Sequence, residues 1–260
     1  MSKTITSLEQ YKIEYAKSIN NPAAFWEEKA NNFTWHKKWD SVLEWDFTKP
    51  EIKWFEGGKL NITENCLDRH LKTKGEQTAI KWIANNPNEQ SRCLSYNELH
   101  TEICKFANVL KNNDAKKGDR ICLYMPMVPE LAIAVLACAR IGAIHSVVFA
   151  GFSSKSLSDR INDADCSILI TADGGFRGEK ITPLKEISDT AMQSTPSIEK
   201  CIVLERTKNT ISMKNGRDVW WHDEMLKVTS NCPIEIMDAE APLFILYTSG
   251  STGRPKGIQH

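Results

Sequence analysis

Apolar strand-like segments alternate with helical patterns from residue 70 onward, and this alternation limits the possible folds more than any other feature. Ser95 and Glu98 have the spacing of a capping box, and apolar residues follow at helical intervals as far as residue 110. Strands are expected at 121–125, 144–149, 167–171 and 201–204, and helices at 129–141, 154–164 and 183–192. Because the strands contain few polar residues, the pattern predicts an α/β fold, in which helices flank both faces of a parallel sheet.

Residues 1–69 differ in composition from the rest of the chain. Their charged residues are interrupted by Asn-Pro, Asn-Asn and Gly-Gly breaks, and they contain Trp26, Trp35, Trp39, Trp45 and Trp54. We expect an irregular segment in which each indole packs its flat face on a neighbouring core. An aromatic platform for bases or sugars is the alternative, but basic residues are not interleaved with the tryptophans as that would require. The predicted domains are therefore 1–69 and 70–260.

A loop rich in hydroxyl and glycine residues follows the apolar segment 243–246. Residues 247–257 read Tyr-Thr-Ser-Gly-Ser-Thr-Gly-Arg-Pro-Lys-Gly. Glycines let backbone N–H groups approach an anion, hydroxyls donate hydrogen bonds, and Arg254 and Lys256 supply positive charge, so the loop is expected to bind phosphate. It is not a Walker A loop, because Pro255 and Gly257 stand where the second Gly and the Ser/Thr would be. The simpler alternative is a flexible polar connection.

A second possible anion site lies at residues 172–180, Ala-Asp-Gly-Gly-Phe-Arg-Gly-Glu-Lys. Asp173 and the two glycines after it are expected to reverse the chain, so that Arg177 and Lys180 converge on one phosphate. An ordinary turn with solvated charges is the alternative. Both loops, and a third at 149–152, follow predicted strands, and ligands of such sheets bind beyond the carboxyl ends of the strands.

Charge and hydropathy exclude several classes of partner. The 33 basic and 33 acidic residues balance, which argues against nucleic-acid binding and against an anionic membrane surface. The longest apolar run, 131–139, is too short to span a bilayer, and the N-terminus has no signal-peptide pattern. The eight cysteines form no Cys-x-x-Cys pair and are expected to be buried thiols in a cytoplasmic protein without metal ligands.

Several strings together resemble one family. Residues 247–257 match the signature of the acyl-adenylate-forming superfamily almost letter for letter. The segments 65–70 (Asn-Cys-Leu-Asp-Arg-His), 124–127, 137–142, 145–152, 172–175 and 216–222, with a Trp-x12-Trp spacing near the N-terminus, are similar to AMP-forming acetyl-CoA synthetases (acetate–CoA ligases). The resemblance covers nearly the whole chain. It implies the first portion of the large N-terminal domain of an adenylate-forming enzyme.

The resemblance also implies a reaction and its substrates. Members of this family use Mg-ATP to convert acetate to acetyl-adenylate and pyrophosphate, and CoA then displaces AMP. The residues implied to hold the β and γ phosphates of ATP are Thr248, Ser249, Gly250, Ser251, Thr252, Gly253 and Lys256. Those implied to bind CoA are Arg177, Gly178, Glu179, Lys180, Phe149, Ala150 and Gly151. Glu179 departs from the family, which usually has glycine there, and a carboxylate beside CoA phosphates is unfavourable unless it is neutralised.

Other parts of the family pattern are absent from this sequence. The resemblance assigns no residue here to adenine, the acyl group, magnesium or the adenylation lysine, so no catalytic residue and no metal ligand are predicted. We therefore expect the 260-residue chain to need the missing C-terminal part of the same enzyme and to have no ligase activity alone. The alternatives are a free-standing nucleotide- or CoA-binding module, a regulatory remnant, or a ligase that prefers propionate.

Overall fold

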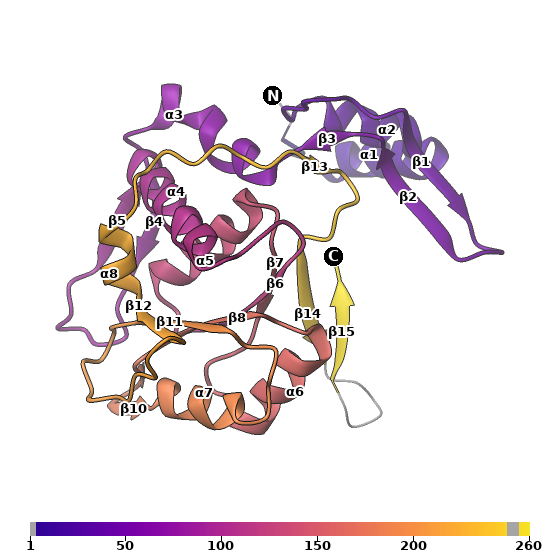
Figure 1. Ribbon diagram of the computed structural model, residues 1–260. Coiled ribbons are helices and arrows are strands. Elements are labelled where there is room, and N and C mark those ends of the chain that lie inside the picture. The colour runs from indigo at the N-terminus through magenta and orange to yellow at the C-terminus, as the bar shows by residue number, and fades with distance from the viewer. Residues whose placement is uncertain (1–3, 249–254) are drawn as a thin grey trace. The chain divides into compact units, whose positions relative to one another are not determined.

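The computed structural model of the protein describes residues 4–248 and 255–260 (Figure 1). They form two compact units. The first contains the residues up to Arg69 together with Ile236–Ala241, and the second contains His70–Glu235 and Pro242–His260.

The first unit begins with two helices, α1 (Leu8–Asn20) and α2 (Pro22–Ala30). Ser7 Oγ accepts the N–H of Gln10 at the start of α1, and Asn21 Oδ1 accepts the N–H of Ala24 at the start of α2. An antiparallel hairpin follows, made of β1 (Ser41–Asp46) and β2 (Glu51–Glu56). The expectation of an irregular segment is therefore wrong for much of this region.

A short strand pair and a π-helical turn complete the first unit. Strand β3 (Lys59–Leu60) pairs antiparallel with β13 (Met237–Asp238), which explains why residues 236–241 belong here. The π-helical turn η1 (Glu64–Asp68) contains Asn65, whose side chain bonds both the N–H and the C=O of Thr34 and accepts from Arg69 Nη1 at 2.9 Å. Within the resemblance segment 65–70, Asn65 and Arg69 thus stabilise the fold of this unit.

The tryptophans of the first unit contact other aromatic rings, mostly edge to face. Trp35 and Trp39 have ring centroids 4.9 Å apart, and both contact Phe55. Trp26 meets the ring of Trp54 at 83°, and Trp45 stays largely exposed. The expectation that each indole lies flat on a core is wrong, because these rings use one another as partners in the arrangement that aromatic quadrupoles favour.

The second unit is built on a seven-stranded sheet with the order β12-β11-β8-β6-β7-β14-β15. All neighbours are parallel except the last pair, which is antiparallel. The strands in sheet order are β12 (Asp218–Trp220), β11 (Lys200–Leu204), β8 (Ile168–Ala172), β6 (Arg120–Tyr124), β7 (Ile144–Val147), β14 (Phe244–Thr248) and β15 (Lys256–Gln259). The predicted parallel sheet is thus confirmed.

Helices cover both faces of this sheet, as expected. Figure 1 shows α4 (Tyr96–Asn112) and α5 (Pro129–Arg140) on one side, and α6 (Ser154–Ala164) and α7 (Leu184–Met192) on the other. The predicted capping box of α4 is present, since Ser95 and Glu98 exchange hydrogen bonds of 2.8 and 3.2 Å. The remaining elements are α3 (Arg69–Lys74), β4 (Thr78–Trp82), β5 (Arg92–Ser95), β9 (Gly175–Arg177), β10 (Lys180–Thr182) and α8 (Trp221–Leu226).

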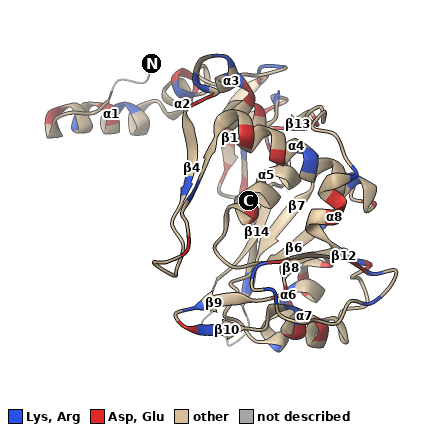
Figure 2. Cartoon of the chain, turned by 90° about the vertical axis from the view of Figure 1, so that its left-hand side faces the viewer, with Lys and Arg blue, Asp and Glu red and all other residues tan. Residues whose placement is uncertain are grey.

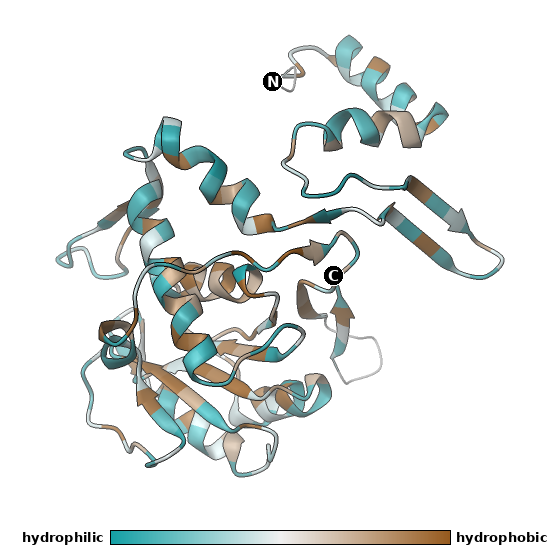
Figure 3. Cartoon of the chain, turned by 45° about the horizontal axis from the view of Figure 1, so that its top comes forward, coloured by the Kyte–Doolittle hydropathy of each residue, from teal (hydrophilic) through white to brown (hydrophobic). Residues whose placement is uncertain are grey.

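The core of the second unit lies between the sheet and its helices. The central strands are coloured mostly as hydrophobic in Figure 3, and Ile121, Leu123 and Ile170 are completely buried. Charged residues of both signs are distributed along the elements (Figure 2). No helix within residues 4–248 and 255–260 is long and apolar enough to cross a membrane.

The cysteines only partly follow the expectation. Six are buried, among them Cys122, Cys138 and Cys166, and burial raises the pKa of Cys201 to about 12. Cys66 and Cys93 are instead exposed. In the part of the chain that the structure describes, no group of three His, Cys, Asp or Glu side chains is arranged to hold a metal ion.

Candidate functional site

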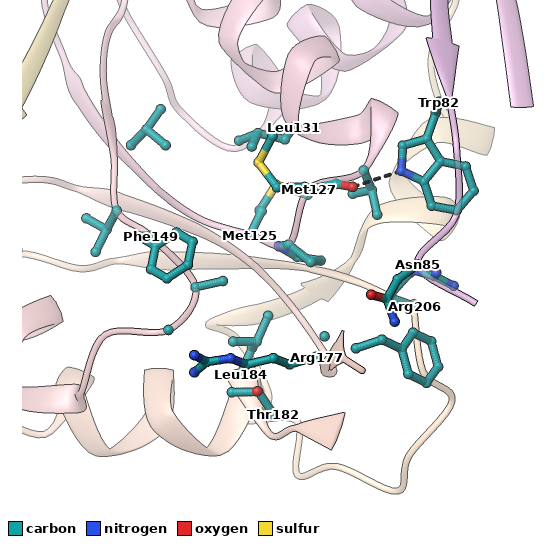
Figure 4. Close-up of a pocket in the computed structure, with 18 of the residues that line it drawn as sticks. Trp82, Asn85, Met125, Met127, Leu131, Phe149, Arg177, Thr182, Leu184 and Arg206 are labelled. Atoms are coloured by element: carbon teal, nitrogen blue, oxygen red, sulfur yellow. Dashed lines mark hydrogen bonds between the residues drawn. The ribbon is translucent and has the colours of Figure 1, made fainter. Parts of the chain in front are cut away.

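A pocket of about 490 Å³ opens in the second unit at the carboxyl ends of its parallel strands. Residues just after β6, β7, β8 and β11 contribute to its wall, as the rule for such sheets predicts. Figure 4 shows Phe149 and Trp82 on opposite sides of this pocket. The lining is mostly apolar and includes Trp82, Met125, Met127, Phe149, Ala150, Gly151, Phe176, Arg177, Leu184 and Arg206.

Three of the predicted CoA-binding residues lie in one loop of this wall. Phe149, Ala150 and Gly151 follow β7 and all line the pocket. The buried Tyr124 fixes the loop, because its hydroxyl donates to the carbonyl of Phe152 at 2.7 Å. A Cβ on Gly151 would come within 2.6 Å of the Phe149 ring, so glycine lets that ring lie close to the backbone. The loop replaces the end of the predicted strand 144–149, since β7 stops at Val147.

The other predicted CoA-binding residues belong to a hairpin formed by β9 and β10. Arg177 pairs with Lys180 across the two strands, and Gly178 and Glu179 form the turn between them. Gly178 has φ +60° with open space around its Cα, so the turn conformation is what favours glycine there. The chain therefore reverses at 178–179 and not, as expected from the sequence, at Asp173 and the glycines after it.

The structure brings the two cations of this hairpin together. Directly opposed residues of an antiparallel pair project to the same face, and like charges there repel each other. Both side chains are exposed, and within the described residues neither forms an ion pair. Only Arg177 lines the pocket, whereas Gly178, Glu179 and Lys180 lie beyond its wall. An anionic group beside the pocket would relieve the repulsion.

Arg206 and Trp82 line the same pocket but were missed by the sequence reasoning. The Arg206 guanidinium lies 4.8 Å from the Phe176 ring centroid and 5.4 Å from that of Trp82. It also pairs with Glu89 at 2.7 Å. Arg206 could have been found, because it follows β11 and thus stands at the carboxyl end of a strand. No comparable signal marks Trp82, which comes from the separate β4–β5 pair.

The predicted phosphate loop lies between β14 and β15. Thr248 and Lys256 are paired at the ends of these two strands, and both are exposed. Ser249, Gly250, Ser251, Thr252 and Gly253 lie outside the described residues, as does Arg254. The two residues that flank the loop are therefore directly opposite each other in the antiparallel pair β14–β15. This pairing fixes where the loop leaves the sheet and where it returns.

Family comparisons agree with the resemblance in the sequence. Residues 67–260 match the family described as AMP-binding enzyme, and residues 11–66 match the one described as acetyl-coenzyme A synthetase N-terminus. Proteins named acetyl-coenzyme A synthetase from Bdellovibrio bacteriovorus and Magnetococcus marinus are 56% and 53% identical to this chain, over 96% and 97% of it. The chain spans 39% of the length of each.

A solved structure supports the fold alone. Acetoacetyl-CoA synthetase from Streptomyces lividans superposes with a TM-score of 0.85 at 24% identity, covering 94% of this chain and 37% of that one. The similarity extends over the α/β sheet and matches the architecture described above. Because the AMP-binding match alone covers residues 67–260, the chain belongs to the family of AMP-binding enzymes, preceded by the N-terminal region typical of acetyl-coenzyme A synthetases.

Proposed function

We propose that the protein to which this chain belongs is an AMP-forming acetate–CoA ligase, which makes acetyl-CoA, AMP and pyrophosphate from acetate, ATP and CoA. The observation that carries the proposal is that the two predicted anion sites follow the carboxyl ends of two strands of one sheet, β8 and β14. The Arg177/Lys180 hairpin follows β8 beside the pocket, and the Thr248–Lys256 pair closes the strands that hold the hydroxyl-rich loop. The relatives named acetyl-coenzyme A synthetase support acetate as the acid.

The chemistry explains why such a protein needs two anion sites. A carboxylate does not react with a thiol until one of its oxygens becomes part of a good leaving group, and adenylation creates that group. The charge that develops on the departing pyrophosphate must be stabilised by fixed donors and cations. We assign this role to Thr248, Ser249, Gly250, Ser251, Thr252, Gly253 and Lys256.

We assign CoA to the pocket and the hairpin beside it. Phe149, Ala150 and Gly151 would contact the nucleotide end of CoA, and Arg177 with Lys180 would neutralise its phosphates. Gly178 and Glu179 form the turn that sets the spacing of the two cations. Magnesium would accompany ATP, but we assign it no ligand among the described residues. A cytoplasmic location stays a prediction.

The test is acetate-dependent release of pyrophosphate by the full-length protein, with propionate as the competing acid. We expect release with acetate and a loss of at least about 100-fold in kcat for Lys256→Ala, since one preorganised donor to a developing anion has that effect. Lys155→Ala, at an exposed lysine on α6, is the control and should keep full activity. Binding of ATP or CoA without any acetate-dependent pyrophosphate release would contradict the ligase and favour a binding module.

A further inference from the structure

Arg160 on α6 holds its guanidinium between two aromatic rings. The guanidinium carbon lies 4.7 Å from the ring centroid of Phe152 and 5.3 Å from that of Tyr247. The residue is only 8% exposed, and its Nη1 donates to the carbonyl of Ser156 at 2.7 Å, which fixes the side chain along its own helix. Arg160 therefore presents a planar cation to both rings at once.

The two rings belong to the two segments that the proposed function uses. Phe152 ends the loop 149–152, and its ring meets that of Phe149, a pocket residue, at a centroid distance of 5.8 Å. Tyr247 directly precedes Thr248, where the phosphate loop leaves β14. These segments are nearly 100 residues apart in the sequence, and the Arg160 side chain contacts both.

A second contact attaches the phosphate-loop strand to the same helix. The Tyr247 hydroxyl donates to Asp163 Oδ2 at 2.7 Å and approaches the Arg160 carbonyl at 3.3 Å. Gly257 faces Tyr247 across β14 and β15, and a Cβ there would lie 3.1 Å from the ring. The ring thus fits closely between α6 and β15, which lie side by side in Figure 1.

Packing alone does not account for an arginine at this position. A buried guanidinium must be compensated for lost hydration, and Leu or Met would fill the space without that cost. Stacking between two rings compensates the charge only while both rings keep their places, so the cation makes the geometry of the two segments interdependent.

We propose that Arg160 is a positioning residue that couples the CoA-side loop 149–152 to the strand carrying the phosphate loop. Arg160 does not line the pocket that we assign to CoA. It sets the ring of Phe152, and through it Phe149, relative to Tyr247 and Thr248. The inference rests on the proposed ligase function. Because coupling between two binding sites is reciprocal, a change at either ring alters the binding of substrate at the other site.

The test compares two half-reactions in the full-length protein. ATP–pyrophosphate exchange with acetate reports on adenylation without CoA, and the complete reaction reports KM for CoA. Arg160→Lys keeps the charge but loses the planar stack, so we expect KM to rise by about tenfold for both ATP and CoA. Arg120→Lys is the matched control. Arg120 bonds Ala164 and Asp165 at the C-terminal end of the same helix and has neither ring as a partner, so both KM values should stay unchanged.

The cross-effect is the sharper measurement. Phe152→Leu removes a ring on the CoA side and should raise KM for ATP in the exchange reaction, where no CoA is present. The melting temperature of each variant is measured to detect global destabilisation. Global destabilisation alone would lower Tm but would not change a KM measured well below Tm. The proposal is overturned if Arg160→Lys shifts only one of the two KM values, or if Phe152→Leu leaves KM for ATP unchanged. A wild-type protein inactive with acetate would instead overturn the proposed function.

Discussion

The carboxylate of Asp173 accepts the backbone N–H of Lys208 at 2.6 Å, although the two residues are 35 positions apart in the sequence. The same carboxylate accepts the N–H groups of Gly174, Arg206 and Thr207 at 2.6 to 3.1 Å. Asp173 is buried, and this set of donors satisfies its oxygens in place of water. The loop after β11 is thereby fastened to the end of β8, and Arg206 is fixed at the pocket wall.

Replacement of Asp173 by alanine should therefore destabilise the second unit. The substitution leaves one buried N–H group, that of Gly174, and the three partly buried ones of residues 206–208 without this acceptor. We expect a loss of about 2–4 kcal/mol in the free energy of unfolding, measured by urea titration. Asp119→Ala is the control, because its exposed carboxylate also accepts a backbone N–H, that of Lys116, and should lose less than about 1 kcal/mol. Equal losses for the two variants would contradict this role.

A buried ion pair offers a second prediction. Lys185 Nζ lies 2.9 Å from Asp218 Oδ2, and both side chains are almost completely buried. Burial raises the pKa of Asp218, but hydrogen bonds from Arg217, Lys214 and Lys185 lower it by more, so the net direction is down. Lys185→Met leaves the carboxylate with fewer partners, and we expect a destabilisation of about 3–5 kcal/mol.

The double variant Lys185→Met/Asp218→Leu distinguishes the interaction between the two charges from the packing of the two side chains. Removing both charges avoids an uncompensated ion, so it should cost less than the sum of the two single changes. Lys227→Met, at an exposed lysine paired with Glu224, is the control and should leave the free energy of unfolding close to that of the wild type. Additive losses in the double variant would show that the two side chains are not energetically coupled.

The main elements of the second unit could be predicted because their signals are local. Ser95 and Glu98 stand three residues apart and cap α4, and the apolar strands at Ile121 and Ile168 are short and continuous. Positions within the site depended on contacts that are distant in sequence. The Asp-Gly-Gly string predicts a turn at Asp173, whereas three of the four N–H groups that its carboxylate accepts come from residues 206–208. No local pattern marks Arg160, because the two rings beside it lie in two separate segments.

The first unit was less predictable for a similar reason. Its tryptophans pair with Phe55, Phe47 and one another, and sequence spacing does not say which rings will meet. Its strand β3 pairs with β13, more than 170 residues later. Single-sequence patterns report local periodicity and cannot identify a partner so far along the chain.

Glu179 stands in the turn between the two cations of the hairpin, and it supplies a third prediction. If CoA phosphates bind Arg177 and Lys180, the nearby carboxylate repels them, so Glu179→Gly should tighten CoA binding by about threefold to tenfold in the full-length protein. Isothermal titration at low salt measures the change, and the difference should shrink at high salt. Glu199→Gly, at an acidic residue outside this hairpin and outside the pocket wall, is the control. An unchanged CoA affinity in Glu179→Gly would mean that the carboxylate points away from the nucleotide.

His145 on β7 makes the stability of the second unit depend on pH. Burial lowers the pKa of this imidazole to about 4 from an ordinary value of 6.5, and its Nδ1 has no hydrogen-bond partner among the described residues. Between these two pH values the unfolded state binds more protons than the folded state, so stability falls as the pH falls from about 6.5 to about 4.

The expected loss from His145 alone is at most about 3 kcal/mol over that range. Urea titrations at pH 7 and pH 4.5 measure it as the difference between the wild type and His145→Gln, because the variant lacks the titrating group while other groups contribute equally to both. His222→Gln makes the same replacement at an exposed histidine and is the control for the substitution itself. A group weakens the fold on acidification only if its folded pKa lies below its unfolded pKa. If His145→Gln loses as much stability on acidification as the wild type, the buried imidazole is not the source of the pH dependence.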